Sequence, residues 1–206
     1  MTGCTPAATS PLAGKLTAVS ASASSGLIVL ATDEGTVAIY DLSKATITER
    51  FHVKNETILS IVMPDRERLF VGTSAGRVLR IRRESEPIPV AEHNEAIQDL
   101  RLSADENSLY FRTISGKLGA CRLIDGAAET NPPILIDDLA DSDVVVPVTA
   151  ILIQPKGLVV GYQNGQIQQW DPVTNSVIKL LKHDKPIVCL NADVSRDRVE
   201  FVDSAG

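Results

Sequence analysis

The residues around Gly165 alternate between apolar and polar in a way that predicts two antiparallel strands. In GLVVGYQNGQIQQWDP, residues 157–172, an apolar run rises to Tyr162, a polar turn follows at Asn164-Gly165, and a second run ends at Trp170-Asp171. A tight turn between antiparallel strands needs a positive φ, which glycine adopts without a Cβ clash. The stretch is therefore predicted to be a β-hairpin.

The same hairpin pattern recurs along the chain. It reads LIVLATDEGTVAIYD at 27–41, LFVGTSAGRVLRIR at 69–82 and LYFRTISGKLGACR at 109–122, and its first half reappears as VEFVDSAG at 199–206. The turn glycines Gly35, Gly76, Gly116, Gly165 and Gly206 are separated by 41, 40, 49 and 41 residues. A period near 40 indicates a repeat architecture.

Each hairpin is flanked by further strand-like segments. An apolar segment precedes it, beginning at Lys15, Thr57, Ala96, Val146 and Pro186, and a weaker one follows it, beginning at Thr46, Pro87, Pro132 and Ser176. No apolar stripe of helical spacing runs for three turns, so no helix is predicted. Four-stranded units at this period are typical of the blades of a β-propeller.

The predicted fold is therefore all-β: a β-propeller with four complete blades and a partial fifth. The blades are expected at about 15–54, 55–94, 95–140, 145–184 and 185–206, after a disordered N-terminal segment 1–14. The third strands are apolar on two faces, one carrying Val37, Val78, Leu118 and Ile167 and the other Tyr40, Ile81, Cys121 and Trp170. Because both faces need covering, the sheets are expected to stack face to face.

Several residues resemble the motif of the WD-repeat propeller family, over roughly residues 15–206. Trp170-Asp171 ends a third strand as the family's Trp-Asp does, and Tyr40-Asp41 is a near match. His52, His93 and His183 lie 24, 23 and 23 residues before Gly76, Gly116 and Gly206, where the family has the His of its Gly-His pair. The resemblance implies structural roles for the histidines, for Trp170 and for the turn glycines.

The chain departs from the family in its polar residues. In the family, the histidine joins a buried hydrogen-bond network with a turn acid, a strand Ser or Thr, and the Trp. Here the repeats that carry a histidine lack the acid before the turn glycine, and the repeat with Trp170 lacks the histidine. A partly made buried network is costly, so we expect aliphatic packing to hold the blades together.

The fifth unit stops at its turn glycine, Gly206, after two of its strands. Propellers usually close with four to eight blades. Three explanations stay open: the front part of a longer propeller, completion by a second chain through self-association, or a four-blade ring with a frayed end. The proline-containing N-terminal segment is a poor closing strand.

The 49-residue spacing places an insertion at residues 126–147. It carries Asp137, Asp138, Asp141 and Asp143, which form either a solvated connector or a loop that binds a basic partner. A Ca²⁺ loop is disfavoured because the tight ligand spacing and the glycine turn are missing.

Four arginines cluster near the end of the second hairpin: Arg77, Arg80, Arg82 and Arg83. They form either a patch for phosphate or acidic groups or a set of edge charges that prevent sheet-to-sheet aggregation. The phosphoinositide-binding branch of the family has Arg-Arg-Gly, whereas Glu84 follows Arg82-Arg83 here, so that function is not carried over.

Composition narrows the function classes. The net charge is −6, from 26 acidic and 20 basic residues, which gives no basic footprint for nucleic acid. The three cysteines, Cys4, Cys121 and Cys189, are widely spaced, so neither a disulfide framework nor a zinc site is predicted; Cys121 and Cys189 are expected to be buried. Neither a secretory signal nor a membrane-spanning stretch is found, so a cytoplasmic or nuclear protein without membrane insertion is expected.

No nucleophile elbow, phosphate-binding glycine loop or zinc helix is present. We therefore expect no catalytic residue, no metal and no cofactor. The predicted function is a non-catalytic scaffold that binds other proteins within a larger assembly. The alternatives are a propeller module of a coat, transport or trafficking subunit and, less favoured, a propeller enzyme with its active site in the central channel.

Overall fold

The computed structural model describes residues 12–22, 25–83, 85–124, 127–128, 134–135, 146–154, 157–171, 176–193 and 198–205. Regular structure in these ranges consists of β-strands arranged in five antiparallel sheets, without a helix. The sheets are numbered here as blades 1 to 5. The fold is thus all-β, as the alternating pattern predicts.

Blades 1 and 2 are complete four-stranded sheets in which neighbours in sequence are neighbours in space. Blade 1 has the order β1 (Leu16–Ser22), β2 (Leu27–Thr32), β3 (Thr36–Asp41) and β4 (Thr46–His52). Blade 2 has the order β5 (Ile58–Val62), β6 (Leu69–Thr73), β7 (Arg77–Ile81) and β8 (Ile88–Glu92). Short connections between consecutive strands produce this meander.

Blade 3 departs from the pattern at its outer edge. Its three long strands are β9 (Ile97–Leu102), β10 (Ser108–Thr113) and β11 (Leu118–Ile124). Two short strands, β12 (Ala127–Ala128) and β13 (Ile134–Leu135), pair with opposite ends of β11. Among the described residues, the place of a fourth strand is therefore divided between two short pieces, and both lie within the insertion at residues 126–147.

Blade 4 is again four-stranded, and blade 5 is a two-stranded sheet. Blade 4 consists of β14 (Val148–Gln154), β15 (Gly157–Tyr162), β16 (Gln166–Asp171) and β17 (Ser176–Lys182). Blade 5 consists of β18 (Ile187–Asp193) and β19 (Arg198–Asp203). Of the predicted N-terminal segment 1–14, residues 1–11 lie outside the described residues, as does Gly206.

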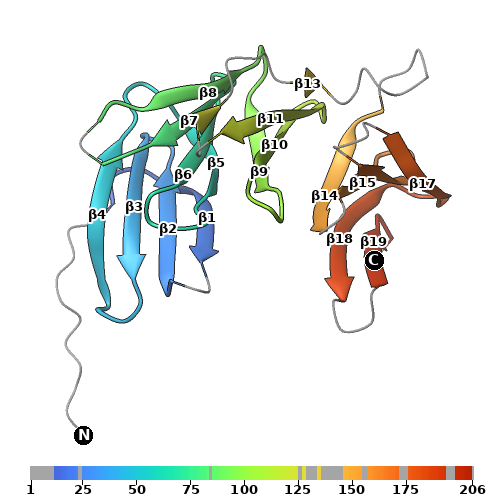
Figure 1. Ribbon diagram of the computed structural model, residues 1–206, viewed down its shortest axis with the longest axis horizontal. Helices are drawn as coiled ribbons and strands as arrows, with labels where there is room; N and C mark the ends of the chain where they lie inside the picture. The colour runs from blue at the N-terminus through green and yellow to red at the C-terminus, as the bar shows by residue number, and fades with distance from the viewer. Residues whose placement is uncertain are drawn as a thin grey trace, which may run out of the picture.

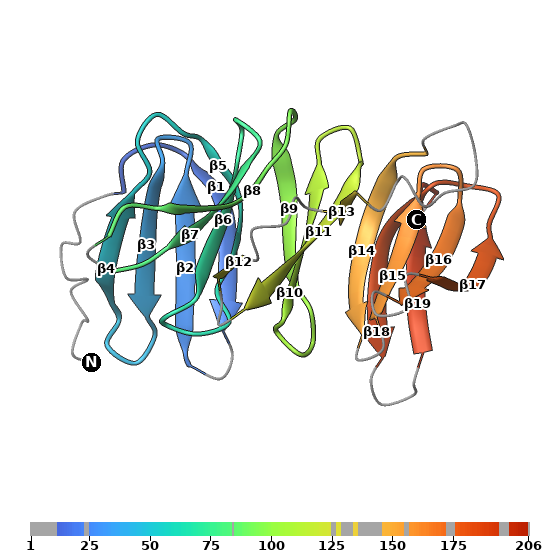
Figure 2. The same cartoon turned by 45° about the horizontal axis from the view of Figure 1, so that its top comes forward.

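The blades follow one another in chain order, from blue to red (Figures 1 and 2). The first strands of blades 1 and 2, of blades 2 and 3, and of blades 4 and 5 run side by side, whereas β9 and β14 have no comparable contact. This is the arrangement of propeller blades around an axis.

Apolar clusters fill the four interfaces between consecutive blades, here called seams 1 to 4. Seam 1 is aliphatic and includes Val37, Ile39, Ile58 and Val71. Seams 2, 3 and 4 contain Val78, Leu118 and Ile167 respectively, each from the face that meets the next blade. Ile81, Cys121 and Trp170 point to the preceding seam. The prediction of two covered faces is confirmed for these residues, while Tyr40 is half-buried at the outer face of blade 1.

The two described cysteines differ in environment. Cys121 is buried in seam 2, and burial raises the pKa of its thiol to about 12. Cys189 is exposed, so its predicted burial is wrong. The pairing of β18 with β19 shifts register between Ile187 and Cys189. The same shift occurs at Ser60 of β5 and Ala150 of β14, and both of these residues are buried against the next blade. No described sheet packs on this face of blade 5, which is why Cys189 is open to solvent.

Candidate functional site

The turn glycines do more than reverse the chain. Gly35, Gly76, Gly116 and Gly165 have φ values of 76°, 83°, 88° and 82°. The carbonyl oxygen of each accepts a backbone N–H from the segment that enters the next blade, donated by Val53, His93, Val148 and His183 respectively. A Cβ at Gly35, Gly76 or Gly165 would overlap the carbonyl oxygen of that same donor residue. The glycine is thus needed both for the turn and for close packing between blades.

The histidines do not all share one position. His93 and His183 bind the glycine of the preceding turn. The equivalent residue in blade 1 is Val53, which is 3% exposed, and His52 precedes it as an exposed residue at the end of β4. Placing His52 with the other two is therefore wrong. Neighbouring residues of a strand point to opposite faces, so one residue is enough to move the side chain from the seam to solvent.

Three threonines belong to the turns, and our sequence analysis missed them. Thr32, Thr73 and Thr113 are at most 1% exposed, and each hydroxyl oxygen accepts the backbone N–H of the residue four positions later at 3.1–3.3 Å. In blade 4 Tyr162 takes the place of the threonine. The recurrence of Thr-x-x-Gly in three repeats was the available signal.

Trp170 packs without the polar partner that the family motif implies. Its ring lies edge-on to Tyr110, with centroids 6.0 Å apart and an interplanar angle of 80°. The indole Nε1 is buried and has no hydrogen-bond partner among the described residues. Tyr110 is 1% exposed, and burial raises its pKa to about 12. The contact therefore stabilises seam 3 through aromatic packing.

Asp41, of the Tyr40-Asp41 pair, joins blades 1 and 2. Its Oδ1 accepts hydrogen bonds from the Ser43 hydroxyl at 2.6 Å and the Ser43 backbone N–H at 3.0 Å, and its Oδ2 lies 3.0 Å from Arg66 Nη2 in blade 2. The Ser43 hydroxyl and the Lys44 and Ser43 amides lower the pKa of Asp41 to about 2. Ionisation of the carboxylate therefore strengthens its contacts with the turn and with blade 2.

His183 and Asp203 join blades 4 and 5. His183 Nε2 lies 2.7 Å from Asp203 Oδ2, and the histidine ring packs against Phe201 with centroids 5.2 Å apart. The hydrogen bond from His183 lowers the pKa of Asp203 below its usual value. A contact between a histidine and a carboxylate is thus present. Its acid is Asp203, at the end of β19 and three residues before the turn glycine, and not the residue directly before that glycine.

The four arginines of the predicted patch are not gathered into one surface. Arg77 pairs with the buried Glu56 at the end of the blade where the turn glycines lie. Arg83 Nε binds Glu49 Oε2 at 2.8 Å across seam 1, and Arg82 is exposed. Arg80 is buried within the sheet. The four acids of the other predicted site, Asp137, Asp138, Asp141 and Asp143, lie outside the described residues.

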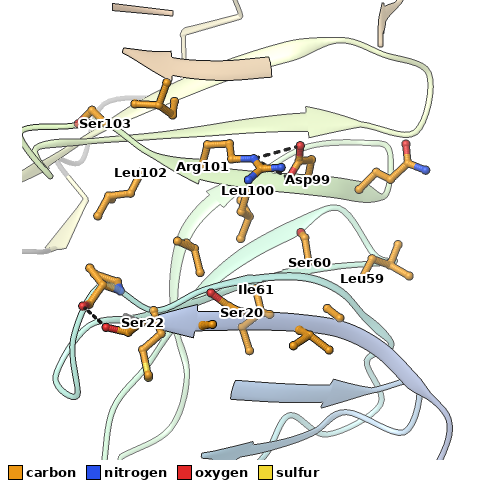
Figure 3. Close-up of a pocket in the computed structure, with 18 of the residues that line it drawn as sticks. Ser20, Ser22, Leu59, Ser60, Ile61, Asp99, Leu100, Arg101, Leu102 and Ser103 are labelled. Carbon is orange, nitrogen blue, oxygen red and sulfur yellow. Dashed lines mark hydrogen bonds and ion pairs between the residues drawn. The ribbon is translucent and has the colours of Figure 1, made fainter. Parts of the chain in front are cut away.

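A groove of about 760 Å³ runs along the first strands of blades 1, 2 and 3, with Ile153 of β14 at its far side. In Figure 3, Ser20 and Ser22 of β1 lie on one side of the groove, and Asp99, Leu100 and Arg101 of β9 lie on the other side. Arg101 Nε lies 3.3 Å from Asp99 Oδ1. The Ser60 hydroxyl donates to Ile97 O at 3.3 Å, and the Ser22 hydroxyl donates to Pro64 O at 3.2 Å, so each joins two blades. These bonds between blades hold the strands that line the groove in place. The apolar side chain of Val19, which is 55% exposed, is open to solvent.

Within the described part of the chain, no set of three or more His, Cys, Asp or Glu residues is placed to hold a metal ion. The described residues also contain no helix long and apolar enough to cross a membrane. What the groove offers is a mixed surface of hydroxyls, one ion pair and exposed aliphatic side chains.

Comparisons with known proteins agree with this architecture. No family model matches the sequence, and no curated protein matches it. Among solved structures, the chain is similar to the β-propeller domain of Cps50 (Swd1) from Myceliophteria thermophila, with a TM-score of 0.75 and 15% identity. The match covers 94% of this chain and 64% of that one, so the chain spans just under two thirds of that domain. Together with the five sheets, the match shows that the chain has the β-propeller fold.

Proposed function

We propose that the chain is a non-catalytic interaction module of WD-repeat type that binds other proteins within a larger assembly. Its main support is the groove, where interblade hydrogen bonds from Ser22 and Ser60 fix the strands while Val19 and Arg101 stay accessible. A preorganised surface of this kind binds at a low entropic cost. The likeness to a β-propeller domain is in keeping with this role.

The groove suits a polypeptide better than a small substrate. It is lined mainly by the first strands of three blades, and its polar side chains are hydroxyls, the Asp99–Arg101 ion pair, the Gln98 amide and the Glu106 carboxylate. Binding energy in such a surface comes from a few anchors with a polar rim around them. Val19, exposed among serines on β1, is the apolar anchor that we assign.

Affinity capture of the tagged 206-residue chain followed by mass spectrometry tests the proposal. We expect a reproducible protein partner, retained at least tenfold less by V19D/R101E, a change of about 1.4 kcal/mol or more. The matched control is I114S, which replaces an apolar residue that is 64% exposed and does not line the groove. Equal capture by V19D/R101E and wild type would contradict the groove as the docking surface.

The acidic insertion remains a second predicted docking site. A variant with Asp→Asn at 137, 138, 141 and 143 is compared in the same capture experiment. Loss of the partner in this variant alone would assign docking to the insertion, and retained binding would remove the insertion from the proposal.

A further inference from the structure

Arg80 is a buried cation without a partner. It lies in the middle of blade 2, on β7, and is 7% exposed. Its Nε and Nη1 atoms are buried and have no hydrogen-bond partner, and no described residue forms an ion pair with it. Nη2 is not among the buried atoms, so it is the nitrogen that can meet a ligand. A buried charge is expected to be paired, so Arg80 calls for an explanation.

The fold itself does not need an arginine here. Counted from the turn glycine, the equivalent residues are Ile39, Ala120 and Gln169 in blades 1, 3 and 4. Ile39 is 1% exposed and packs in seam 1. Apolar side chains thus fill this position in blades 1 and 3, so the packing of a blade does not depend on a charge here.

One of the two acids that act on Arg80, Asp65, is engaged elsewhere. Asp65 accepts hydrogen bonds from the Glu67 and Arg68 amides at 2.8 and 2.9 Å and from Arg68 Nε at 2.7 Å. Arg68 also binds Glu106 across seam 2. Arg68 and Arg82 repel the Arg80 charge, and Asp65 and Glu67 attract it; burial, the largest effect, lowers its pKa. Because an arginine stays protonated near neutral pH, the charge persists.

We propose that Arg80 binds a carboxylate of a partner protein through Nη2, on the face of β7 that also carries Val78 into seam 2. The inference rests on the proposed function, since it names the chemistry of one contact of that partner. Arg68 and Arg82 add positive charge near Arg80, and Asp65 and Glu67 add negative charge. A monoanion pairs the buried guanidinium, whereas a phosphate dianion would meet stronger repulsion from Asp65 and Glu67.

Acetate is the probe for this site. Thermal unfolding of the 206-residue chain is measured at pH 7 in sodium acetate and in sodium chloride at equal ionic strength. For wild type we expect a saturable rise in Tm of about 3 °C above the chloride series once acetate is several-fold above its Kd. R80M should show the same Tm in both salts, and the control R50M, which alters an exposed arginine, should respond like wild type.

Three results would overturn the proposal: no acetate-specific rise in wild type, an unchanged rise in R80M, or a phosphate response through Arg80 that exceeds the acetate response. If R80M does not fold, acetate is instead added to wild type and the NMR resonance of the Arg80 Nε–H is followed. A resonance that does not shift would contradict the site. No partner enters this titration, so its failure leaves the groove proposal standing, and failed partner capture leaves the anion site standing.

Discussion

Seams 1 and 3 solve the same packing problem in different ways. Seam 1 buries a set of aliphatic side chains, places β1 beside β5, and is crossed by ion pairs from Asp41 to Arg66 and from Glu49 to Arg83. Seam 3 combines five buried aliphatic side chains with the Tyr110–Trp170 contact, its first strands are apart, and no ion pair crosses it among the described residues. The comparison teaches that one repeat can yield interfaces of unequal strength.

A single strand position explains much of the difference. The residue before the turn Thr or Tyr is Ala31, Gly72, Arg112 and Gly161 in blades 1 to 4. At Gly72 and Gly161 the missing Cβ leaves room for Ile97 and Ile187 of the next first strand. Arg112 is too large for such an approach, and its Nε is buried without a hydrogen-bond partner. The strands of blades 3 and 4 therefore cannot close as the others do.

The largest effect is expected from the aromatic contact of seam 3. Trp170→Ala should lower the free energy of unfolding by about 3–5 kcal/mol, because it leaves a large cavity beside Tyr110. Urea unfolding followed by circular dichroism measures this. V177A is the control, since Val177 is 47% exposed on the neighbouring strand. A loss below about 1 kcal/mol would mean that the ring is not an anchor of the seam.

Substitutions at this strand position should have opposite effects on the free energy of unfolding in the two kinds of seam. Gly72→Ala should cost about 1–3 kcal/mol, because the new Cβ would overlap the Ser60 hydroxyl and the Ile97 side chain. Arg112→Ala should be neutral or stabilising by up to about 1 kcal/mol, because it removes a buried unpaired N–H group. Both are read from urea unfolding, and destabilisation by both changes would refute the role given to this position.

The loss of stability at acid pH should depend on Asp41. Its folded-state pKa of about 2 is below the ordinary value of 3.8, so its contribution is present above about pH 4 and is lost as the pH falls toward 2. Asp41→Asn should remove this part of the pH dependence between pH 5 and 2. Thermal unfolding across that range measures it, with D184N, at an exposed acid, as the control. If Tm fell equally between pH 5 and 2 in wild type and D41N, this role of Asp41 would be contradicted.

The smallest effect is expected from the outer ion pair of seam 1. Arg83 is 61% exposed, so Arg83→Gln should change the free energy of unfolding by about 0.5 kcal/mol or less. A much larger loss in urea unfolding would show that charge, and not aliphatic packing, distinguishes seam 1 from seam 3.

The fold was predictable because its signal is local and repeated. The turn glycines and the alternation around them depend on backbone geometry that the sequence states directly, as at Gly76 and Gly165. Errors arose where the outcome depends on more than the local pattern: His52 is displaced by one position, and Cys189 lies on a face of blade 5 that no described sheet covers. The burial of Arg80 depends on which blade covers it, which no single hairpin reveals.

The candidate surfaces were less predictable for a related reason. The groove gathers side chains from β1, β5, β9 and β14, which are far apart in the sequence and carry no common motif. The arginines seemed grouped along the chain, yet Arg77 and Arg83 point to separate acids in different parts of the structure. Arginines that are close in the sequence thus predicted one patch, but in the folded sheet their side chains point to different places.

Native-state hydrogen exchange resolved by peptide tests the inequality of the seams most directly. Protection of a backbone amide reports the free energy of the local opening that exposes it. We predict that the amides of β2 and β6, which border seam 1, exchange more slowly than those of β10 and β15 at seam 3. Equal protection, or slower exchange at β10 and β15, would contradict the account.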